Sequence, residues 1–200
     1  MHFYPKQSLI VLCSSMMILT GCQSLPISQK LPPLVEQNIK NTTTSSTNQF
    51  NLQGKIGIKT PQQSGSAFFT WVQQQDQFDI ELSGILGIGK TQITGELGKV
   101  ELNSSRTGLI SAETPEELLE IATGWQAPIT YIIDWVQARP ATSQAEISTD
   151  SSMRPTQFIE EGWVVDLSYK DQTNLPNRLV LKQTLESGKE NRITMVIQNR

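Results

Sequence analysis

The sequence predicts a mainly β fold with two helices, arranged as an incomplete antiparallel β-barrel, or half-barrel, whose small helical lid encloses an apolar cavity. Two observations support this prediction. Apolar residues alternate with polar ones in short segments over residues 50–110 and 163–197, and Gly, Asn or Ser turns separate these segments. Two helical segments lie between the blocks, and they are too few to cover every inward-facing apolar position of so long a sheet.

The N-terminal segment has the features of a bacterial secretory signal. Lys6 precedes an apolar run that begins at Leu9, and small residues follow the run. The run is shorter than the ~20 residues that a membrane-spanning helix needs. Leu19-Thr20-Gly21-Cys22 resembles the lipobox of bacterial lipoproteins at all four positions. This resemblance implies that residues 1–21 are removed and that Cys22 becomes the lipidated first residue; a plain secretory signal with a chance Cys is the alternative.

The residues after Cys22 predict how the chain is anchored. Gln23 follows Cys22 where an Asp would favour the inner membrane in the lipoprotein sorting pattern, so this resemblance implies the outer membrane. Residues 22–49 form a predicted flexible tether, because their many Pro, Thr, Ser and Asn residues cannot bury enough apolar surface to fold. Such a tether spans roughly 30 Å on average. Residues 50–200 are then a single folded domain.

Composition excludes several classes of function. The 200-residue chain has a net charge of -3, and without residues 1–21, which hold one basic and no acidic residue, the net charge is -4. A mildly acidic chain with no Lys/Arg cluster is not expected to bind nucleic acid. Every Cys and His precedes residue 23, namely His2, Cys13 and Cys22. The mature domain therefore has no disulfide, thiolate metal site or His-based catalytic triad.

The first strand block is defined by a period of two. Gly54 occupies one inward position of the first strand, and Pro61 to Gly65 form a predicted turn. The segment 67–72 is apolar on both faces, which predicts a strand covered on both sides. The alternating positions of the other strands in this block are Phe50, Leu52, Ile56, Ile58, Phe78, Ile80, Leu82, Ile93, Leu97, Val100 and Leu102.

Two helices are predicted between the strand blocks. Thr114-Pro115-Glu116-Glu117 combines an N-cap, a Pro at the first helical position and a capping-box Glu, and Gly124 supplies the C-terminal end. The second helix is predicted from Pro128 to Pro140, because apolar residues at 129, 132, 133 and 136 have helical spacing. Residues 141–157 are polar without a clear period and are predicted to form a loop.

No arrangement of residues predicts an enzyme. Three carboxylate pairs are candidates for acid–base chemistry, and each has a simpler structural interpretation as a helix first turn, a turn before a strand, or the exposed face of a strand. These pairs are Glu116 with Glu117, Glu160 with Glu161, and Asp79 with Glu81. The Gly-rich segment 84–89 lies between strands, whereas a phosphate-binding loop precedes a helix.

The same Gly-rich segment is unusually apolar for a connection between strands. Such connections are normally polar, but this one carries Ile85, Leu86 and Ile88 among three glycines. It is either a loop packed under the core or an apolar tip that contacts a membrane or an acyl chain.

Several motifs resemble the LolB family of outer-membrane lipoproteins. The first motifs are Gly54-Lys55-Ile56-Gly57-Ile58, Ala67-Phe68-Phe69-Thr70-Trp71 and Leu82-Ser83-Gly84-Ile85-Leu86-Gly87. The central motifs are Pro115-Glu116-Glu117-Leu118-Leu119, Gly124, Pro128 and Asp134-Trp135-Val136. The resemblance covers residues 50–140 well and rests on strand pattern alone over 155–200.

The resemblance implies a monomeric half-barrel that receives lipoproteins from a LolA-type periplasmic carrier and inserts them into the outer membrane, without a nucleotide, metal or other cofactor. It also implies that an apolar Leu in the loop after the third strand protrudes and is needed for delivery. Leu86 is the matching residue, with Ile85 beside it and Leu82 as the fallback. The family has Pro where this chain has Ile85.

Periodicity assigns a set of apolar residues to the cavity that would hold the acyl chains of the cargo. A register error of one residue would invert the assignment of a strand. The predicted walls are Ile56, Ile58, Phe69, Trp71, Ile80 and Ile93 from strands, and Leu118, Ile121, Ile132 and Ile133 from the helices. Two alternatives remain: a lipoprotein that binds another lipid, such as a phospholipid or lipopolysaccharide, and a structural scaffold lipoprotein whose cavity is filled by side chains.

Overall fold

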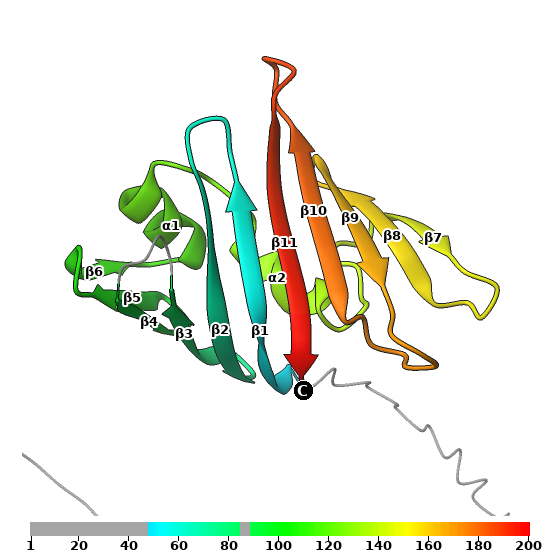
Figure 1. Cartoon of the computed structure of the whole chain (residues 1–200), viewed down its shortest axis with the longest axis horizontal. Helices are drawn as coiled ribbons and strands as arrows, with labels where there is room; N and C mark the ends of the chain where they lie inside the picture. Colours follow the sequence, from blue (N-terminus) through cyan, green and yellow to red (C-terminus); the bar gives the residue numbers. More distant parts are fainter. Residues whose placement is uncertain (1–47, 85–88) are drawn as a thin grey trace, which may run out of the picture. The chain divides into compact units, whose positions relative to one another are not determined.

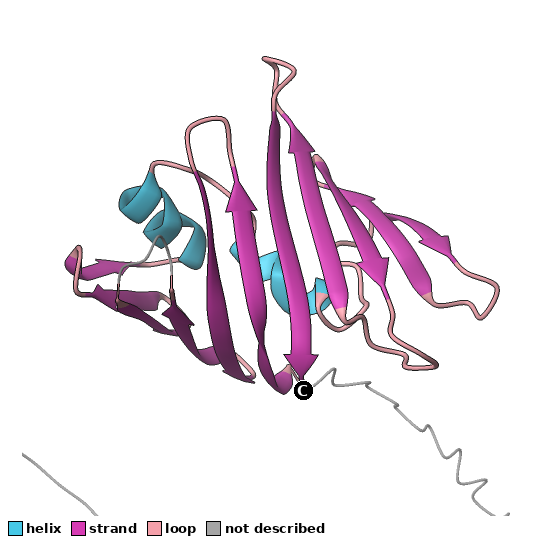
Figure 2. Cartoon of the chain, in the orientation of Figure 1, coloured by secondary structure: helices cyan, strands magenta, loops and turns pink. Residues whose placement is uncertain are grey.

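The computed structural model describes residues 48–84 and 89–200. These residues form one open antiparallel sheet and two helices, and the sheet is not closed into a barrel (Figures 1 and 2). The elements are β1 (Gln49–Lys59), β2 (Ser64–Gln74), β3 (Gln77–Ser83), β4 (Lys90–Glu96), β5 (Lys99–Ser104), β6 (Gly108–Ala112), α1 (Pro115–Thr123), α2 (Ile129–Trp135), β7 (Glu146–Thr149), β8 (Pro155–Glu160), β9 (Trp163–Ser168), β10 (Arg178–Thr184) and β11 (Glu190–Asn199). The half-barrel fold predicted from the sequence is confirmed.

The strand order places both ends of the domain at the centre of the sheet. The order is β6-β5-β4-β3-β2-β1-β11-β10-β9-β8-β7, so the first and last strands are neighbours (Figure 1). Every other neighbouring pair is consecutive in the chain. The segment that carries α1 and α2 therefore connects one sheet edge, β6, to the other, β7. Both helices lie on the same face of the sheet (Figure 2).

Gly54 allows the central strands to approach closely. It lies opposite Phe69 of β2 and Ile197 of β11, and the pairing of β1 with β11 shifts register between Gln53 and Gly54. A Cβ atom at this position would collide with the backbone carbonyl oxygen of Val196 and would lie 3.0 Å from the Phe69 ring. A β-bulge bends the strand that carries it, and glycine permits this bend at the middle of the sheet.

The two halves of the sheet are filled differently. The fully buried apolar residues belong mainly to β8–β11, the central strands and the α2 region, where Trp135 and Val136 have no exposed surface. They pack into one cluster: Leu52, Phe69, Trp71, Ala127, Ile132, Trp135, Val136, Phe158, Trp163, Val165, Leu167, Leu179, Leu181, Ile193, Met195 and Ile197. The inward-facing residues of β3 and β4 are only partly buried. The half of the sheet beneath α2 is therefore densely packed, and the half beneath α1 is not.

α1 has the ends that the sequence predicts. The Thr114 hydroxyl accepts a hydrogen bond from the backbone N–H of Glu117 at 3.2 Å, and the Glu117 carboxylate accepts one from the N–H of Glu113. Gly124 ends the helix in the left-handed region, with φ of 68°. The carboxylate of Glu116 reaches α2 and accepts a hydrogen bond from the N–H of Thr130 at 2.7 Å, so it links the two helices.

α2 and the segment after it differ from the prediction. The helix ends at Trp135 and not at Pro140, because Ala138 has a φ of 57° and the chain has already turned. The predicted loop over residues 141–157 contains β7 and the first residues of β8. β7 is a short edge strand with every residue exposed, so it has no apolar alternation by which a sequence pattern could reveal it.

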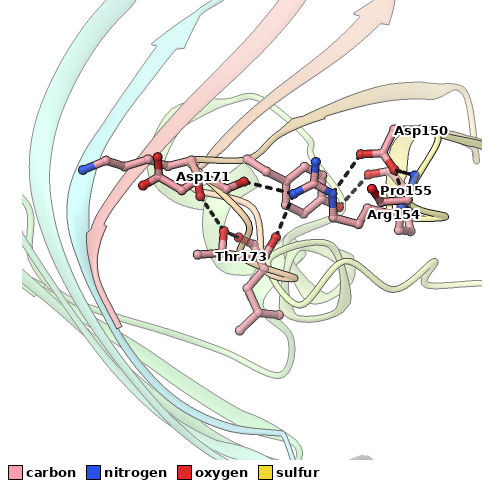
Figure 3. Close-up of polar contacts among 9 residues, drawn as sticks. Asp150, Arg154, Pro155, Asp171 and Thr173 are labelled. Atoms are coloured by element: carbon pink, nitrogen blue, oxygen red, sulfur yellow. Dashed lines mark hydrogen bonds and ion pairs between the residues drawn. The ribbon is translucent and has the colours of Figure 1, made fainter.

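A polar cluster joins two turns at the far end of the second strand block (Figure 3). The Arg154 side chain donates hydrogen bonds to the Asp150 carboxylate and to the carbonyl oxygens of Asp171 and Thr173. Its guanidinium also lies 4.7 Å from the centre of the Tyr169 ring. A planar guanidinium suits several simultaneous contacts of this kind. The cluster fixes the β9–β10 connection against the β7–β8 turn.

Glu160 attaches α2 to the sheet through a buried carboxylate. This residue is only 5% exposed. One carboxylate oxygen accepts hydrogen bonds from the Trp135 indole N–H at 2.6 Å and from the N–H of Ala141, and the other accepts one from the N–H of Thr142. Burial alone would raise the pKa of Glu160, but these hydrogen bonds stabilise the charged form and hold the pKa below its usual value.

We predict that Glu160 makes the stability of the domain pH-dependent. A lowered folded-state pKa contributes stability that is present above the unfolded value, about 4.3, and is lost as the pH falls through the folded value. Glu160→Gln should lower the free energy of unfolding at pH 7 by about 1–3 kcal/mol, because its amide cannot accept all three hydrogen bonds. Its loss of stability below about pH 4 should be smaller than that of the wild type.

Urea unfolding between pH 3 and pH 7 would measure both effects. Glu161→Gln is the matched control, because Glu161 is the exposed neighbour of Glu160. Equal pH profiles for Glu160→Gln and the wild type would contradict the assignment.

Candidate functional site

Two adjoining cavities lie between α1 and the first half of the sheet. The larger has a volume of about 250 Å³ and the smaller about 150 Å³. Ile58, Leu82, Leu119 and Thr123 line both of them. The larger cavity is also lined by Phe78, Ile80, Thr91, Ile93, Leu102, Ser104, Ser105, Arg106, Thr107, Pro115, Leu118, Ala122 and Ile129. The smaller is also lined by Ile56, Gln63, Ser64, Gly65, Ser66, Ala67 and Trp125.

The walls of the larger cavity come from aligned strand positions. Ile80 of β3 lies opposite Ile93 of β4, and Ile93 lies opposite Leu102 of β5. Side chains at such paired positions point to the same face of a sheet. The cavity floor is therefore a continuous row of branched aliphatic side chains.

The inner face of α1 combines two leucines with small residues. Leu118, Leu119, Ala122 and Thr123 line the cavities, and they fall on one side of a helix at spacings of three and four. The side chains of Ala122 and Thr123 are too short to reach the strands, so the space beneath them is not filled. In contrast, Trp135 fills the corresponding position beneath α2. The difference in side-chain size explains why one half of the domain is hollow.

The structure brings half of the predicted wall residues to the cavities. Ile56, Ile58, Ile80, Ile93 and Leu118 line one or both of them. Phe69 and Trp71 of β2 and Ile132 of α2 lie in the packed cluster and line neither cavity. Leu82 lies one residue before the end of β3, and its side chain lines both cavities.

Two predicted wall residues lie elsewhere. Ile121 is 55% exposed on the outer side of α1, so assigning it to the cavity was wrong. The helix turns 100° per residue, and the inward stripe formed by 115, 118, 119 and 122 leaves position 121 outside it. Ile133 lines a separate surface pocket together with Thr130 and Asp134.

Several residues that line the two cavities were not predicted to do so. Leu119 and Leu102 were recognised as apolar positions but not assigned to the cavity, and Phe78 was placed on a strand only. Ala122 and Thr123 carry no apolar signal, although their spacing of four from Leu118 and Leu119 could have indicated the face of the helix. Trp125 follows the predicted helix end, where periodicity no longer applies.

Three predicted site residues lie outside the described residues. Cys22, Ile85 and Leu86 belong to the ranges 1–47 and 85–88. Their lipid-anchoring and membrane-contact roles stay predictions.

The site is a pair of mainly apolar cavities. Its inner walls are mostly aliphatic and aromatic side chains. The exposed polar lining residues include Gln63, Ser64 and Ser66 in the smaller cavity and Ser105, Arg106 and Thr107 in the larger. Across residues 48–84 and 89–200, no group of three His, Cys, Asp or Glu side chains is placed to hold a metal ion. No helix within these ranges is long and apolar enough to cross a membrane. Such a cavity favours the apolar part of a ligand by removing it from water.

Each carboxylate pair considered for catalysis has at least one member engaged in a structural contact. Glu116 and Glu117 bond to backbone N–H groups at the starts of α2 and α1. Asp79 accepts hydrogen bonds from the Gln92 amide across β3 and β4. Glu160 has the three hydrogen bonds described above. None of these residues lines either cavity.

Comparison with known proteins identifies the family. Residues 48–199 match the family model described as "Outer membrane lipoprotein LolB". The chain is 40% identical over 154 residues to the outer-membrane lipoprotein LolB of Stutzerimonas stutzeri, covering 75% of this chain and 72% of the relative. It is 34% identical over 198 residues to that of Pseudomonas savastanoi pv. phaseolicola, covering 95% and 94%. It is 38% identical to that of Pseudomonas putida over 78% and 75% of the two chains. With an open half-barrel, an apolar cavity beneath α1 and this similarity along its length, the chain belongs to the LolB family of outer-membrane lipoproteins.

Proposed function

We propose that this protein is an outer-membrane-anchored acceptor that takes lipoproteins from a LolA-type periplasmic carrier and inserts them into the outer membrane. The observation that carries the proposal is the apolar double cavity beneath α1. Family membership supports it, because the relatives are named as outer-membrane lipoproteins of the LolB type. The scaffold alternative is less favoured, since its cavity would be filled by side chains, whereas this one is open space.

The anchor follows from the N-terminal sequence. Residues 1–21 are removed, Cys22 carries the lipid, and residues 22–49 tether the domain of residues 50–200. Each buried CH₂ contributes about 0.8 kcal/mol to membrane attachment, and more than one acyl chain is needed for stable anchoring. The protein then remains on the periplasmic face of the outer membrane, where cargo must arrive.

Transfer is driven by the difference in affinity between two apolar cavities. Exposing a single acyl chain to water would cost about 0.8 kcal/mol for every CH₂. The carrier must therefore dock at the cavity mouth, so that the chain passes from one cavity to the other without contacting water. No nucleotide is needed for a transfer that runs downhill.

α1 is the element that moves to admit the cargo. The larger cavity, about 250 Å³, lies below the ~300–1,000 Å³ usual for sites that hold drug-sized ligands, and a lipoprotein carries several acyl chains. Ala122 and Thr123 on the inner face of α1 leave open space between this helix and the sheet, into which the helix can shift. α2 stays fixed through Trp135 and Glu160.

The loop between β3 and β4 delivers the cargo to the membrane. Ile85 and Leu86 supply an apolar tip, and Leu82 leads from the cavity wall toward that loop. This arrangement gives the acyl chain an apolar route out of the cavity.

The test of the proposal uses the soluble form lacking Cys22. It would be mixed with a LolA-type carrier that is loaded with a labelled lipoprotein. We expect the label to move to this protein without nucleotide. Retention of all the label on the carrier, with the acceptor folded, would contradict the proposal and favour the alternative of another lipid, which extraction and mass spectrometry of bound lipid would then identify.

Filling the cavity should block acceptance of cargo. Ala122→Trp places a large side chain inside the larger cavity, so we expect acceptance to fall about tenfold or more while the domain stays folded. Ile121→Trp is the matched control, because it adds the same side chain to the exposed side of the same helix. Circular dichroism would check folding, and the transfer assay would measure acceptance. Similar activity in both variants would show that the cavity does not hold the cargo.

Leu86→Glu should separate acceptance from insertion. A charged tip cannot enter the apolar layer of a membrane without a large desolvation cost. We therefore expect normal transfer from the carrier and at least tenfold slower incorporation of the lipoprotein into liposomes. Leu97→Glu, at another exposed turn, is the control. An equal loss of acceptance in Leu86→Glu would exclude a role confined to the membrane.

A further inference from the structure

We propose that Trp125 recognises the carbonyl oxygen at the head of an acyl chain, by donating a hydrogen bond from its indole nitrogen. This inference rests on the proposed function, which places acyl chains in the cavities. It goes further by naming the donor that sets the position and direction of the chain.

The indole nitrogen of Trp125 is buried and has no partner among the described residues. The ring lines the smaller cavity together with Ile56, Ala67 and Leu82. A buried N–H without an acceptor destabilises the folded protein relative to a satisfied one. A phenylalanine would line the cavity equally well without this cost. The N–H is therefore poorly explained by packing alone. Because the nitrogen itself is buried, a small turn of the ring would bring it to a ligand in the cavity.

Two other buried tryptophans show what this fold does with a structural indole. The Trp71 indole N–H donates to the side-chain oxygen of Gln73 at 2.9 Å, and that of Trp135 donates to Glu160 at 2.6 Å. Each of these indoles has an acceptor supplied by a side chain of the protein. Trp125 differs because its ring lines a cavity while its N–H is buried without such an acceptor.

The end of α1 fixes the position of Trp125. Gly124 is left-handed, and the backbone N–H of Trp125 donates to the Thr123 hydroxyl at 3.3 Å. That hydroxyl in turn donates to the carbonyl oxygen of Leu119 at 2.7 Å. The backbone of Trp125 is thus attached to the helix end through a defined set of hydrogen bonds, which keeps the residue at the smaller cavity.

The surroundings of Trp125 match the chemistry of an acyl head. The smaller cavity is bordered by the exposed polar residues Gln63, Ser64 and Ser66 near the β1–β2 turn. It adjoins the larger cavity through shared aliphatic walls. A hydrocarbon chain offers no hydrogen-bond acceptor, but the ester or amide that joins it to its head group does. The carbonyl would lie at Trp125, and the hydrocarbon would extend into the larger cavity, whose own polar residues Ser105, Arg106 and Thr107 are exposed at its border.

The test compares an ester with a hydrocarbon. Methyl laurate and n-tetradecane have similar chain lengths, but only the ester carries a carbonyl. Affinities would be measured by displacement of a fluorescent acyl probe from the soluble domain. We expect Trp125→Phe to weaken binding of methyl laurate about tenfold and to change binding of n-tetradecane less than twofold. In ¹⁵N-labelled wild-type protein, the Trp125 indole resonance should shift with the ester and not with the hydrocarbon.

Trp71→Phe is the matched control, because it removes an indole N–H that already has a protein acceptor. It should lower the unfolding temperature and leave the ratio of the two affinities unchanged, whereas Trp125→Phe should change the ratio without that loss of stability. Parallel changes for ester and hydrocarbon in Trp125→Phe, or an unchanged ester affinity, would overturn the inference.

The carrier-transfer assay on the same variants keeps the two proposals separate. A wild type that prefers the ester through Trp125 but accepts no lipoprotein from the carrier would leave the inference standing and remove the proposed function. Full acceptance of cargo from the carrier with no preference for the ester would overturn the inference and leave the proposed function standing.

Discussion

The attachment of α2 through Trp135 and Glu160 is the interaction on which the rest of the structure depends. An open sheet whose edges do not meet has an apolar inner face that must be covered. α2 covers one half completely, because Trp135 fills the space and Glu160 satisfies both the indole and the following backbone. This half is a densely packed core. The other half can then remain hollow beneath α1 without collapsing.

The hollow half has an energetic consequence. Protein interiors are normally packed at the density of organic crystals, and the lining of an unfilled cavity lacks the dispersion contacts that partner atoms would supply. The residues around this cavity therefore gain more from an apolar ligand than a packed core could. Ala122 and Thr123 on α1 keep the cavity open, since a larger side chain at either position would fill it and supply the missing dispersion contacts to the strand residues.

The strand faces could be predicted from sequence, and the helix faces could not. A strand has only two faces, so alternation places Ile56, Ile58, Ile80 and Ile93 on the inner side once one of them is assigned. α1 is nine residues long and carries Leu118, Leu119 and Ile121, and these three residues fit two different stripes. The short side chains of Ala122 and Thr123 decide the stripe, but a pattern of large apolar residues does not count them.

The periodicity of apolar residues also could not predict which residues act through polar contacts. Glu160 was considered only as half of a carboxylate pair, since nothing in its neighbourhood shows that it meets Trp135, which is 25 residues away in the chain. β7 was missed because an exposed edge strand needs no apolar alternation.

In the proposed function, apolar contacts would determine where an acyl chain lies in the cavities. The event that this proposal requires is the transfer of hydrocarbon between apolar surroundings, and its free energy is set by the area removed from water. For the chain to move in one direction, the affinity for hydrocarbon must increase from one cavity to the next. At one point, a polar donor must distinguish the head of the chain from its tail. In this domain the packed cluster supports the sheet, the small residues of α1 leave the space, and Trp125 supplies the donor that the two proposals use. Each is a local consequence of side-chain size or hydrogen bonding.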